Sequence, residues 1–547
     1  MSFRDQIRAY APHDGDGARK RWVYVPYDQL DHTRSLLAGA DPRETVVAFV
    51  ESREKARRRP YHRQKLALLL SNQRHFALEV AERGFAVAFH GGDGSFGAGL
   101  ERLRDKYGVA RFDVMRPAER ELRVDLDEAR ARGVPIAEHP NTLWLTRHED
   151  FTTVFPSGPP YRMDAFYRHV RRASGVLMKG SKPVGGKYSF DAENREPYRG
   201  QPSAPRTPRF APDAITQEVL DLVATRFPAA FGSLEGFAWP CSAAEAEALW
   251  RHALAEGLPH FGPFEDALCE GEPDLFHTRV SPLVNLGRLP PQRLLADAVD
   301  AYDQGRVPLA SVEGFVRQVI GWREFVRHVH EATDGFRALE ASGAPNHLAA
   351  QEPLPATYWG RAPSGLRCLD VVTDHVHAHG WSHHITRLMV LANIANLLGV
   401  SPRELTDWFW VAYVDAYDWV VEPNVLGMGT FADGGTMTTK PYVSGAAYLK
   451  KMGDSCGRCR FDATGKDPTR PCPITPLYWD FLRRNGEVLR PVDRLTMPLA
   501  AMRKRSPAQR EHAALVRARV LAILREGEVL PASVAAEDPG GFGPPNR

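Results

Sequence analysis

The 547-residue sequence has no apolar run close to the ~18 residues that a membrane-spanning helix needs. Its first residues are polar and include no apolar segment of a secretory signal peptide, so we expect a cytoplasmic protein. Cysteine is scarce, with 6 residues in the chain, which excludes a disulfide-built scaffold. Neither sign of charge dominates, because 70 basic residues face 67 acidic ones, so any surface for nucleic acid must be local.

Length and the alternation of apolar patterns predict several domains, the first of them α/β. A chain of this length exceeds what one hydrophobic core holds. Short apolar runs predict strands at 21–25, 45–52, 85–90 and 112–117. A long amphipathic stretch at 63–84 predicts a helix that closes at Gly84. Strands that alternate with helices indicate a doubly wound parallel sheet, which we assign to residues 20–145.

The remainder of the sequence predicts a connection and then a large all-α domain. Residues 146–215 contain a stretch with many glycines, prolines and basic residues, which is typical of an interdomain linker. From 216 to 520 the apolar spacing is mostly helical, and residues 521–547 are predicted to form a flexible tail. The clearest helical patterns cover 313–333, 383–399 and 404–421.

Polar residues follow two of the predicted strands. Asp28 and Gln29 come after the first strand, and Glu51 lies at the end of the second. Doubly wound sheets bind ligands at the carboxyl ends of their strands, so these side chains are candidates for a ligand site. Loop polar groups or helix caps are an equally consistent interpretation.

Four cysteines form a constellation with metal-site character. Cys456 and Cys459 make a C-x-x-C pair, Cys472 follows after a polar loop, and Cys368 lies far upstream. An iron–sulfur cluster and a zinc ion both take four thiolates, so the spacing leaves these two alternatives open beside unligated cysteines. A redox dithiol lacks its usual βαβ context here.

Histidines and hydroxyls gather in two further segments. The stretch 374–387 contains five histidines but no known zinc spacing, which favours acid–base work by His383 and His384 over metal binding. Arg387 follows one turn later and is positioned to pair with a carboxylate such as Asp415. In H-T-R-V-S-P-L, at 277–283, hydroxyls precede a predicted helix start, where they bind phosphate or simply cap the helix.

These motifs together resemble the photolyase/cryptochrome flavoproteins. H-T-R-V-S-P-L, W-R-E-F (322–325), G-W-x-H-H (380–384) and D-A-Y-D-W (415–419) occur in the order found in that family. The four cysteines, Y-H-x-Q-K-L (61–66) and the M-x-x-x-x-P-V-G-G-K stretch from 178 make the chain similar to the iron–sulfur bacterial cryptochromes and photolyases, which include prokaryotic (6-4) photolyases. The resemblance covers about residues 20–510.

The resemblance implies an α/β antenna domain and an all-α FAD-binding domain that carries one [4Fe-4S] cluster. It implies light-driven repair of UV-damaged DNA by reduced FAD, in a monomer associated with the nucleoid, and in many members a 6,7-dimethyl-8-ribityllumazine antenna. By this resemblance the cluster ligands are expected to be Cys368, Cys456, Cys459 and Cys472. The antenna is expected near Asp28, Gln29 and Glu51.

The same resemblance distributes roles over the helical half. FAD contacts are expected from Thr278, Ser281, Asn285, Arg387, Asp415, Glu422 and Asn424, the last two as rivals for the flavin N5. His384 is expected to donate a proton to the lesion, beside His383, with Tyr442 and Trp322 in the lesion pocket. Trp408 and Trp359 are expected to carry the electron that reduces the flavin.

Three departures from the family pattern affect these expectations. Tyr27 replaces a small residue near the expected antenna site and is expected to narrow it. Phe409 stands where a redox-active tyrosine is common, which predicts slow photoreduction or a route through Trp410 or Tyr413. Leu388 stands where eukaryotic (6-4) photolyases carry a second histidine. A blue-light receptor with the same cofactors, and a non-photochemical DNA-binding protein with a structural four-cysteine site, are the alternatives.

Overall fold

The computed structural model describes residues 2–13, 15–341 and 346–537 and begins with a five-stranded parallel sheet. The strands are β1 Arg21–Tyr24, β2 Thr45–Ser52, β3 Ala86–Gly92, β4 Phe112–Met115 and β5 Ile136–His139. Their order is β3-β2-β1-β4-β5, so the chain first winds outward from β1 and then returns to its other side. This order places the topological switch point between β1 and β4, where doubly wound sheets bind ligands.

Alternating side chains send each strand's apolar groups into two separate cores. Val23 and Val47 pack with the α4 helix, whereas Trp22 and Val46 pack with α5 and α6 on the opposite face. The helices of this region are α1 Phe3–Arg8, α2 Asp16–Arg19, α3 Arg53–Arg57, α4 Arg63–Glu82, α5 Phe96–Tyr107 and α6 Arg120–Ala131. Two covered faces explain why β2 is buried along its full length and why its residues 46–50 are all apolar.

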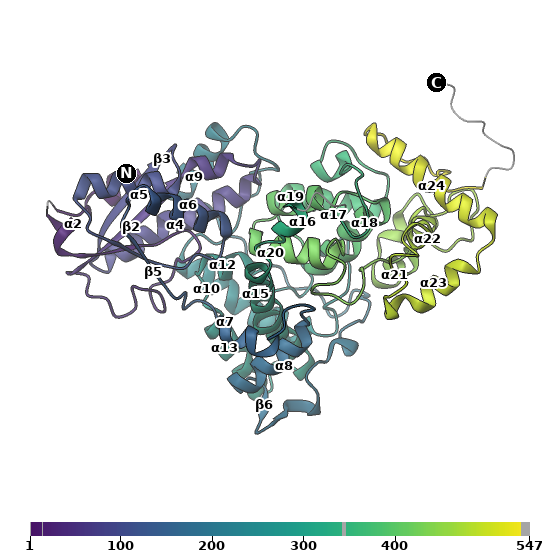
Figure 1. Ribbon diagram of the computed structural model, residues 1–547, viewed down its shortest axis with the longest axis horizontal. Coiled ribbons are helices and arrows are strands. Elements are labelled where there is room, and N and C mark those ends of the chain that lie inside the picture. Colours follow the sequence, from purple (N-terminus) through teal and green to yellow (C-terminus); the bar gives the residue numbers. More distant parts are fainter. Residues whose placement is uncertain (1, 14, 342–345, 538–547) are drawn as a thin grey trace.

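Residues 146–226 contain regular elements as well as loops. They are α7 His148–Val154, α8 Met163–Ser174, the antiparallel pair β6 Met178–Lys179 and β7 Lys182–Pro183, and α9 Ala214–Arg226. The α9 helix returns to the sheet region and packs against α4. In Figure 1 the sheet lies at one end of the molecule, the yellow C-terminal helices lie at the other, and α7, α8 and β6 project between them.

The remaining chain is helical. Its α-helices up to the first histidine motif are α10 Ala243–His252, α11 Leu258–Phe261, α12 Ser281–Leu286, α13 Pro291–Asp303, α14 Leu309–Val316, α15 Glu324–Ala332, α16 Arg337–Ala341 and α17 Arg367–His379. Those that follow are α18 Asn393–Leu398, α19 Pro402–Ala412, α20 Asp418–Val421, α21 Ala446–Met452, α22 Ile474–Arg484, α23 Thr496–Arg503 and α24 Pro507–Arg525. No helix in the described part of the chain is long and apolar enough to cross a membrane. Of the tail predicted for 521–547, residues 538–547 lie outside the described residues.

Four wide-turn π segments interrupt these helices. They are η3 Ala253–Gly257, η4 Arg317–Arg323, η6 Thr386–Ala392 and η7 Glu422–Gly429. Three of them carry residues singled out above, because Trp322 lies in η4, Arg387 in η6 and Asn424 in η7. π segments occur frequently at functional sites, where the extra residue redirects a side chain.

The single helix predicted for 404–421 is wrong. α19 ends at Ala412, Tyr413 is extended (φ −112°, ψ 137°), and a new helix starts at Asp418. The backbone N–H of Val414 donates to the carbonyl of Gly380 at 2.8 Å, a contact with a distant segment that replaces the local helical bond. Helical periodicity continues through this break because the aromatic residues are buried on both sides of it.

Candidate functional site

An ion pair between Arg387 and Asp415 is the centre of a polar cluster in the helical region. The two terminal nitrogens of Arg387 donate to the two carboxylate oxygens of Asp415, each at 3.0 Å. Ser281 Oγ donates to the same carboxylate at 2.7 Å, and Asn285 Nδ2 donates to the Asp415 carbonyl at 3.0 Å. The Asp415 carboxylate, in the break between α19 and α20, thus bonds to Ser281 of α12 and to Arg387 of η6.

Ser281 is not a helix cap. It is the first residue of α12, the N-cap position belongs to Val280, and no side chain of this helix accepts a capping bond. The hydroxyl of Ser281 is engaged with Asp415 instead. Thr278, three residues earlier, is half-buried. The alternative of a simple cap, which the motif left open, therefore does not describe Ser281.

Three histidines surround the start of the same π segment. The rings of His277 and His383 stack at 4.4 Å between centroids with an interplanar angle of 8°, and His384 lies 5.5 Å from His277. Burial, together with the nearby His384 and Arg387, holds the pKa of His277 and of His383 well below the usual range, so both rings are neutral at neutral pH. The side chain of His384 is 42% exposed and its Nε2 lies 3.5 Å from Asp266.

Two cavities adjoin this histidine group. The histidine cavity, of about 570 Å³, is lined by Ser382, His383 and Thr386 on one side and by apolar side chains on the other. The arginine cavity, of about 700 Å³, is lined by Arg279 and Trp239 among others. The two share Pro273 and His375 in their walls. They form a pair of adjoining spaces between α17, η6 and the segment before α12.

Unpartnered polar atoms face these cavities. Among the described residues, four wall atoms are buried without a hydrogen-bond partner: His375 Nε2, His383 Nδ1, Asp274 Oδ1 and Arg279 Nε. Three of them, on His375, Asp274 and Arg279, line the arginine cavity, and because buried polar groups are normally hydrogen-bonded, these three atoms indicate a polar ligand there. A mixture of imidazole, carboxylate and guanidinium groups beside aromatic and apolar walls suits a dinucleotide with a flat ring, which is the chemistry of FAD.

Several residues expected at the flavin or the lesion lie elsewhere. The Glu422 carboxylate is fully buried and accepts from His330 Nε2 at 2.9 Å and Arg337 at 2.8 Å, so its oxygens are engaged away from the two cavities. Asn424 Nδ2 donates to the Val420 carbonyl at 2.8 Å. None of the seven residues expected to contact FAD lines the histidine or arginine cavity, and neither do Trp322 and Tyr442.

The four predicted metal-ligating cysteines line one cavity of about 320 Å³. Cys368 comes from α17, Cys456 from the short helix η8 Ser455–Arg458, Cys459 from the residue after it, and Cys472 from the loop before α22. Burial and the neighbouring thiols raise the pKa of Cys368 well above its usual range. In the described part of the chain, no three cysteine sulfurs lie within 4.8 Å of one another.

Aromatic residues connect the core of the helical region to the Arg387 side chain. Trp408 is fully buried, and its Nε1 donates to the Tyr358 carbonyl at 2.7 Å. The Phe409 ring lies 5.0 Å from Trp408, and the Tyr413 ring lies 6.0 Å from Trp408. The Arg387 guanidinium lies 4.1 Å from the centroid of the Tyr413 ring. Trp359, at the end of the short helix η5 Ala356–Trp359, packs against Phe231 at 5.9 Å.

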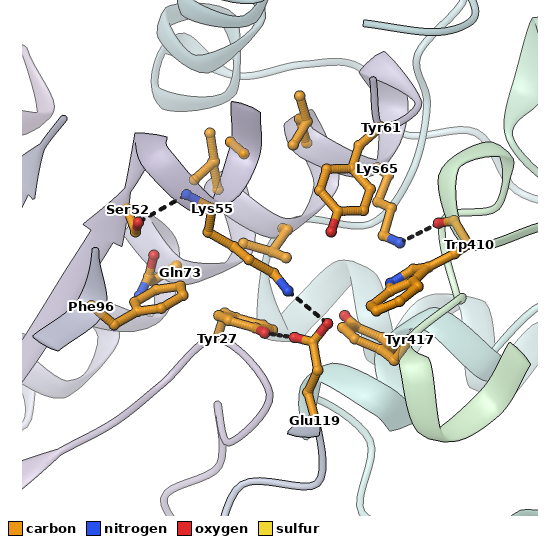
Figure 2. Close-up of a pocket in the computed structure, with 14 residues that line it drawn as sticks. Tyr27, Ser52, Lys55, Tyr61, Lys65, Gln73, Phe96, Glu119, Trp410 and Tyr417 are labelled. Atoms are coloured by element: carbon orange, nitrogen blue, oxygen red, sulfur yellow. Dashed lines mark hydrogen bonds and ion pairs between the residues drawn. The ribbon is translucent and has the colours of Figure 1, made fainter. Parts of the chain in front are cut away.

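A further cavity of about 510 Å³ opens where the carboxyl edge of the sheet meets the helical region (Figure 2). This sheet-edge cavity has aromatic walls from Tyr27, Phe96, Trp410 and Tyr417. The Tyr27 hydroxyl donates to the Glu119 carboxylate, which also receives Lys55 Nζ at 2.8 Å. Lys65 Nζ donates to the carbonyls of Trp410 at 2.8 Å and Ala416 at 2.5 Å, and burial lowers the pKa of this lysine well below its usual range.

The three residues expected at this edge are bonded within the protein. Gln29 Nε2 donates to the Met115 carbonyl at 2.8 Å, across the switch point between β1 and β4. Glu51 receives Arg74 through two bonds of 2.9 and 3.1 Å. Asp28 accepts from the Ala118 N–H at 3.3 Å, and burial raises the pKa of this carboxyl to about 7. All three lie behind the cavity wall and are absent from its lining.

Sequence reasoning missed residues that come together only in the fold. Lys65 lies within the Y-H-x-Q-K-L motif, which marked the family but indicated no role for the lysine. Glu119 follows β4 at the switch point. Its position after the end of a strand could have marked it as a ligand-site candidate from the sequence. Nothing in the local sequence marks Asp266, because its relation to His384 depends on tertiary packing.

The fold and the cavity set define a protein with a doubly wound α/β domain and a helical cofactor-binding domain. The family model described as deoxyribodipyrimidine photo-lyase-related protein matches residues 23–239, and that of the FAD binding domain of DNA photolyase matches residues 315–450. The chain belongs to the photolyase family and carries its FAD-binding domain.

Individual proteins are similar to this chain over different lengths. A (6-4) photolyase of Agrobacterium fabrum is 36% identical over 510 residues, which cover 92% of this chain and 99% of the relative. The crystal structure of a bacterial class III photolyase from Agrobacterium tumefaciens superposes with a TM-score of 0.56 at 16% identity, covering 92% of this chain and 96% of the other. An uncharacterized protein of Acanthamoeba polyphaga mimivirus is 44% identical over 64 residues, which cover 12% of this chain and 52% of that protein.

The Asp415→Asn variant is expected to weaken both folding and FAD retention. The amide keeps the volume but lacks the charge that Arg387 needs, and its NH2 group replaces one of the two oxygens that accept from Arg387. A partly buried charge left without its partner costs about 1–3 kcal/mol. Urea unfolding and the flavin content after gel filtration measure the two effects. Asp266→Asn, at an acidic residue outside this ion pair, is the matched control, and equal loss in both variants would contradict the special role of Asp415.

Proposed function

We propose that this chain is a light-driven DNA photolyase that reverses (6-4) pyrimidine photoproducts. The observation that carries the proposal is His384, an exposed imidazole that follows buried His383 and precedes the Arg387–Asp415 pair by one helical turn. An imidazole can both donate and accept a proton, and at this position it is reachable from solvent, as a proton donor to an everted base must be. The 36% identity to a (6-4) photolyase supports the choice of lesion.

The chain's own residues have defined tasks in this proposal. FAD, when bound in reduced form, supplies a light-driven electron to the lesion. Thr278 and the backbone at Ser281 contact its phosphates, since the Ser281 hydroxyl donates to Asp415. Arg387, held by Asp415, keeps a fixed positive charge beside the flavin ring. His384 donates a proton to the damaged base and recovers it when the two pyrimidines separate. Neutral His383 accepts or donates a hydrogen bond without competing for that proton.

DNA contacts are proposed for exposed basic residues of the helical region. Arg503 and Lys504 lie at the end of α23 and are exposed, and Arg505 stacks over Trp479 at 4.5 Å. Such residues bind phosphates without reading sequence, so binding should fall steeply with salt. The damaged dinucleotide must leave the stack to meet His384, which costs a few kcal/mol and less at an already unpaired lesion.

We propose that the four cysteines hold a [4Fe-4S] cluster in preference to zinc. A tetrahedral zinc site with Zn–S of ~2.3 Å needs its sulfurs roughly 3.8 Å apart. All four cysteines line one cavity, yet among the described residues no three of their sulfurs lie all within 4.8 Å of one another. These wider distances favour a centre larger than a single zinc ion. The thiols need such a centre to lose their protons, because burial raises the pKa of Cys472 to about 12.

The sheet-edge cavity is the proposed site of a 6,7-dimethyl-8-ribityllumazine antenna. Its aromatic walls suit a flat heteroaromatic ring, and Lys55 and Glu119 offer polar contacts at one side (Figure 2). Tyr27 narrows the cavity from the sheet side, so the ring would stack between Tyr27 and the helical region. Acid extraction of purified protein and chromatography of the released pigment test this assignment.

Illumination of the reduced protein with separate (6-4) and cyclobutane oligonucleotides tests the proposed function. We expect blue light to consume the (6-4) substrate and leave the cyclobutane substrate intact, with no change in the dark. Repair of the cyclobutane substrate alone would change the lesion assignment. Repair of neither substrate by flavin-loaded protein would contradict the proposal and favour a blue-light receptor.

Tyr413→Phe is expected to slow the photoreduction of oxidised flavin. Phe409 cannot be oxidised by a flavin as tyrosine can, and Tyr413 is the oxidisable ring that adjoins both Trp408 and Arg387. The rate of flavin reduction is measured from the flavin absorbance after timed periods of illumination in the presence of an external reductant. Phe409→Tyr is the matched gain-of-function variant and should accelerate the reaction. An unchanged rate in Tyr413→Phe would direct attention to Trp410.

A further inference from the structure

We propose that His277, His383 and His384 form a binding site for a soft divalent transition metal, with Zn²⁺ as the natural candidate. Within residues 2–13, 15–341 and 346–537, they are the one group of at least three metal-ligating side chains whose ligand atoms all lie within 4.8 Å of one another. The histidine-rich sequence favoured acid–base work over metal binding, because the three ligands do not follow a known spacing. His277 precedes α12 and lies more than a hundred residues before the other two.

The ligand atoms are available. His277 Nε2 and His383 Nδ1 are buried and have no hydrogen-bond partner among the described residues. A neutral imidazole carries a lone pair on one ring nitrogen, so each ring can offer one ligand atom. His384 is exposed, which leaves an entry path from solvent to the buried pair.

The geometry requires a small adjustment. Zinc holds imidazole nitrogens at ~2.0–2.1 Å, so two ligands of one tetrahedral ion are roughly 3.3 Å apart. The parallel stack of His277 on His383 must therefore open by rotation of the rings about their side-chain bonds. The side chain of His384 is 42% exposed, so solvent-filled space adjoins it into which its ring can rotate.

Neighbouring charges permit a divalent ion. Asp266 lies 3.5 Å from His384 Nε2, where a carboxylate orients a metal-bound imidazole or completes the coordination. Arg387 is the nearby cation, and its charge is offset by the two bonds to Asp415. Three imidazoles with one carboxylate select zinc or copper over Mg²⁺, which prefers oxygen ligands.

Occupation of this site would inhibit repair reversibly, a consequence that rests on the proposed function. A metal ion bound to a nitrogen of His384 occupies the lone pair there, so that nitrogen cannot carry the proton that the damaged base needs. The ion would also lie beside His384, where the proposed function requires the everted base to approach. Micromolar zinc would then stop the reaction, and a chelator would restore it. Cysteine chemistry is not involved, because Cys368 and its three companions belong to a separate cavity.

Equilibrium dialysis of the EDTA-washed, flavin- and cluster-loaded full chain against Zn²⁺ tests the site, in the dark and without DNA. We expect one added zinc per chain, unaffected by excess Mg²⁺, with an X-ray absorption shell of nitrogen or oxygen at ~2.0–2.1 Å. A sulfur shell near ~2.3 Å would overturn the proposal, because the zinc would then be on cysteine.

Variants separate the three histidines from their surroundings. His384→Ala should abolish the added zinc, Asp266→Asn should weaken it by about 10–100-fold, and His512→Ala on α24 should leave it unchanged. Equal zinc binding by wild type and His384→Ala would overturn the proposal. Repair without zinc is measured separately, so failure of the metal site leaves the proposed function standing and failure of repair leaves the metal result intact.

Discussion

The His384→Ala variant is expected to lose repair of (6-4) oligonucleotides while it keeps its flavin. The side chain is exposed and contacts the protein chiefly through Asp266 and the edge of His277, so its removal should not disturb the fold. General acid–base catalysis by a positioned side chain contributes about 10²–10⁴-fold, and we expect a loss of that size in repair yield per absorbed photon. Oligonucleotide chromatography after timed illumination, with flavin absorbance as the loading check, gives both quantities.

Two controls make this result specific. His384→Gln keeps a hydrogen-bonding group of similar length but cannot donate a proton near neutral pH, so it should be as inactive as the alanine variant. His512→Ala changes a histidine on α24, outside the cavity walls, and should repair at the wild-type rate. Full repair by His384→Ala would remove the proton-donor role and return attention to His383.

The sheet was predictable from sequence to within a few residues. The strand predicted at 45–52 is β2 with the same limits, because two covered faces demand an unbroken apolar run. β5 was not recognised, since its four residues are half-buried or exposed at the edge of the sheet and show no strong apolar pattern. The helix over 404–421 was wrong because contacts from Arg387 and Gly380 hold residues 413–417 in a non-helical turn.

The candidate site was predictable only where a motif specifies a pair of side chains. Arg387 and Asp415 meet as their spacing and family pattern indicated. The direction of a side chain was not predictable, and Glu422 illustrates this, since His330, Arg337 and Arg403 turn its carboxylate away from the cavities. The sheet-edge cavity was also beyond sequence reasoning, because its lining comes from segments that meet only after the two regions dock.

A contact of the Asp418 side chain joins the helical region to the sheet region. The Asp418 carboxylate accepts from the backbone N–H groups of Arg120 at 2.7 Å and Glu121 at 3.2 Å, at the start of α6. A helix N-terminus favours a negative charge, so this residue of the helical region caps a helix of the sheet region.

Cys459→Ala is expected to yield poorly soluble protein with little flavin. The four cysteines join α17 to the segment from η8 to α22, so the centre that they hold connects elements that are nearly ninety residues apart in the chain. Metal binding of this kind contributes directly to folding, and three thiolates cannot replace four without exposing the centre. α17 also supplies His375 to the histidine and arginine cavities, so its displacement should release a cofactor bound there.

A matched cysteine distinguishes loss of the centre from loss of a buried thiol. Cys241 is buried within the core beside α4 and lies outside the four-cysteine cavity, so Cys241→Ala should cost only the packing of one small side chain and keep iron, sulfide and flavin at wild-type levels. Soluble yield, iron and sulfide content, and flavin absorbance are compared for both variants. A soluble, fully flavinated Cys459→Ala protein would contradict the structural role, because the helices around His375 would then hold their places without the fourth ligand.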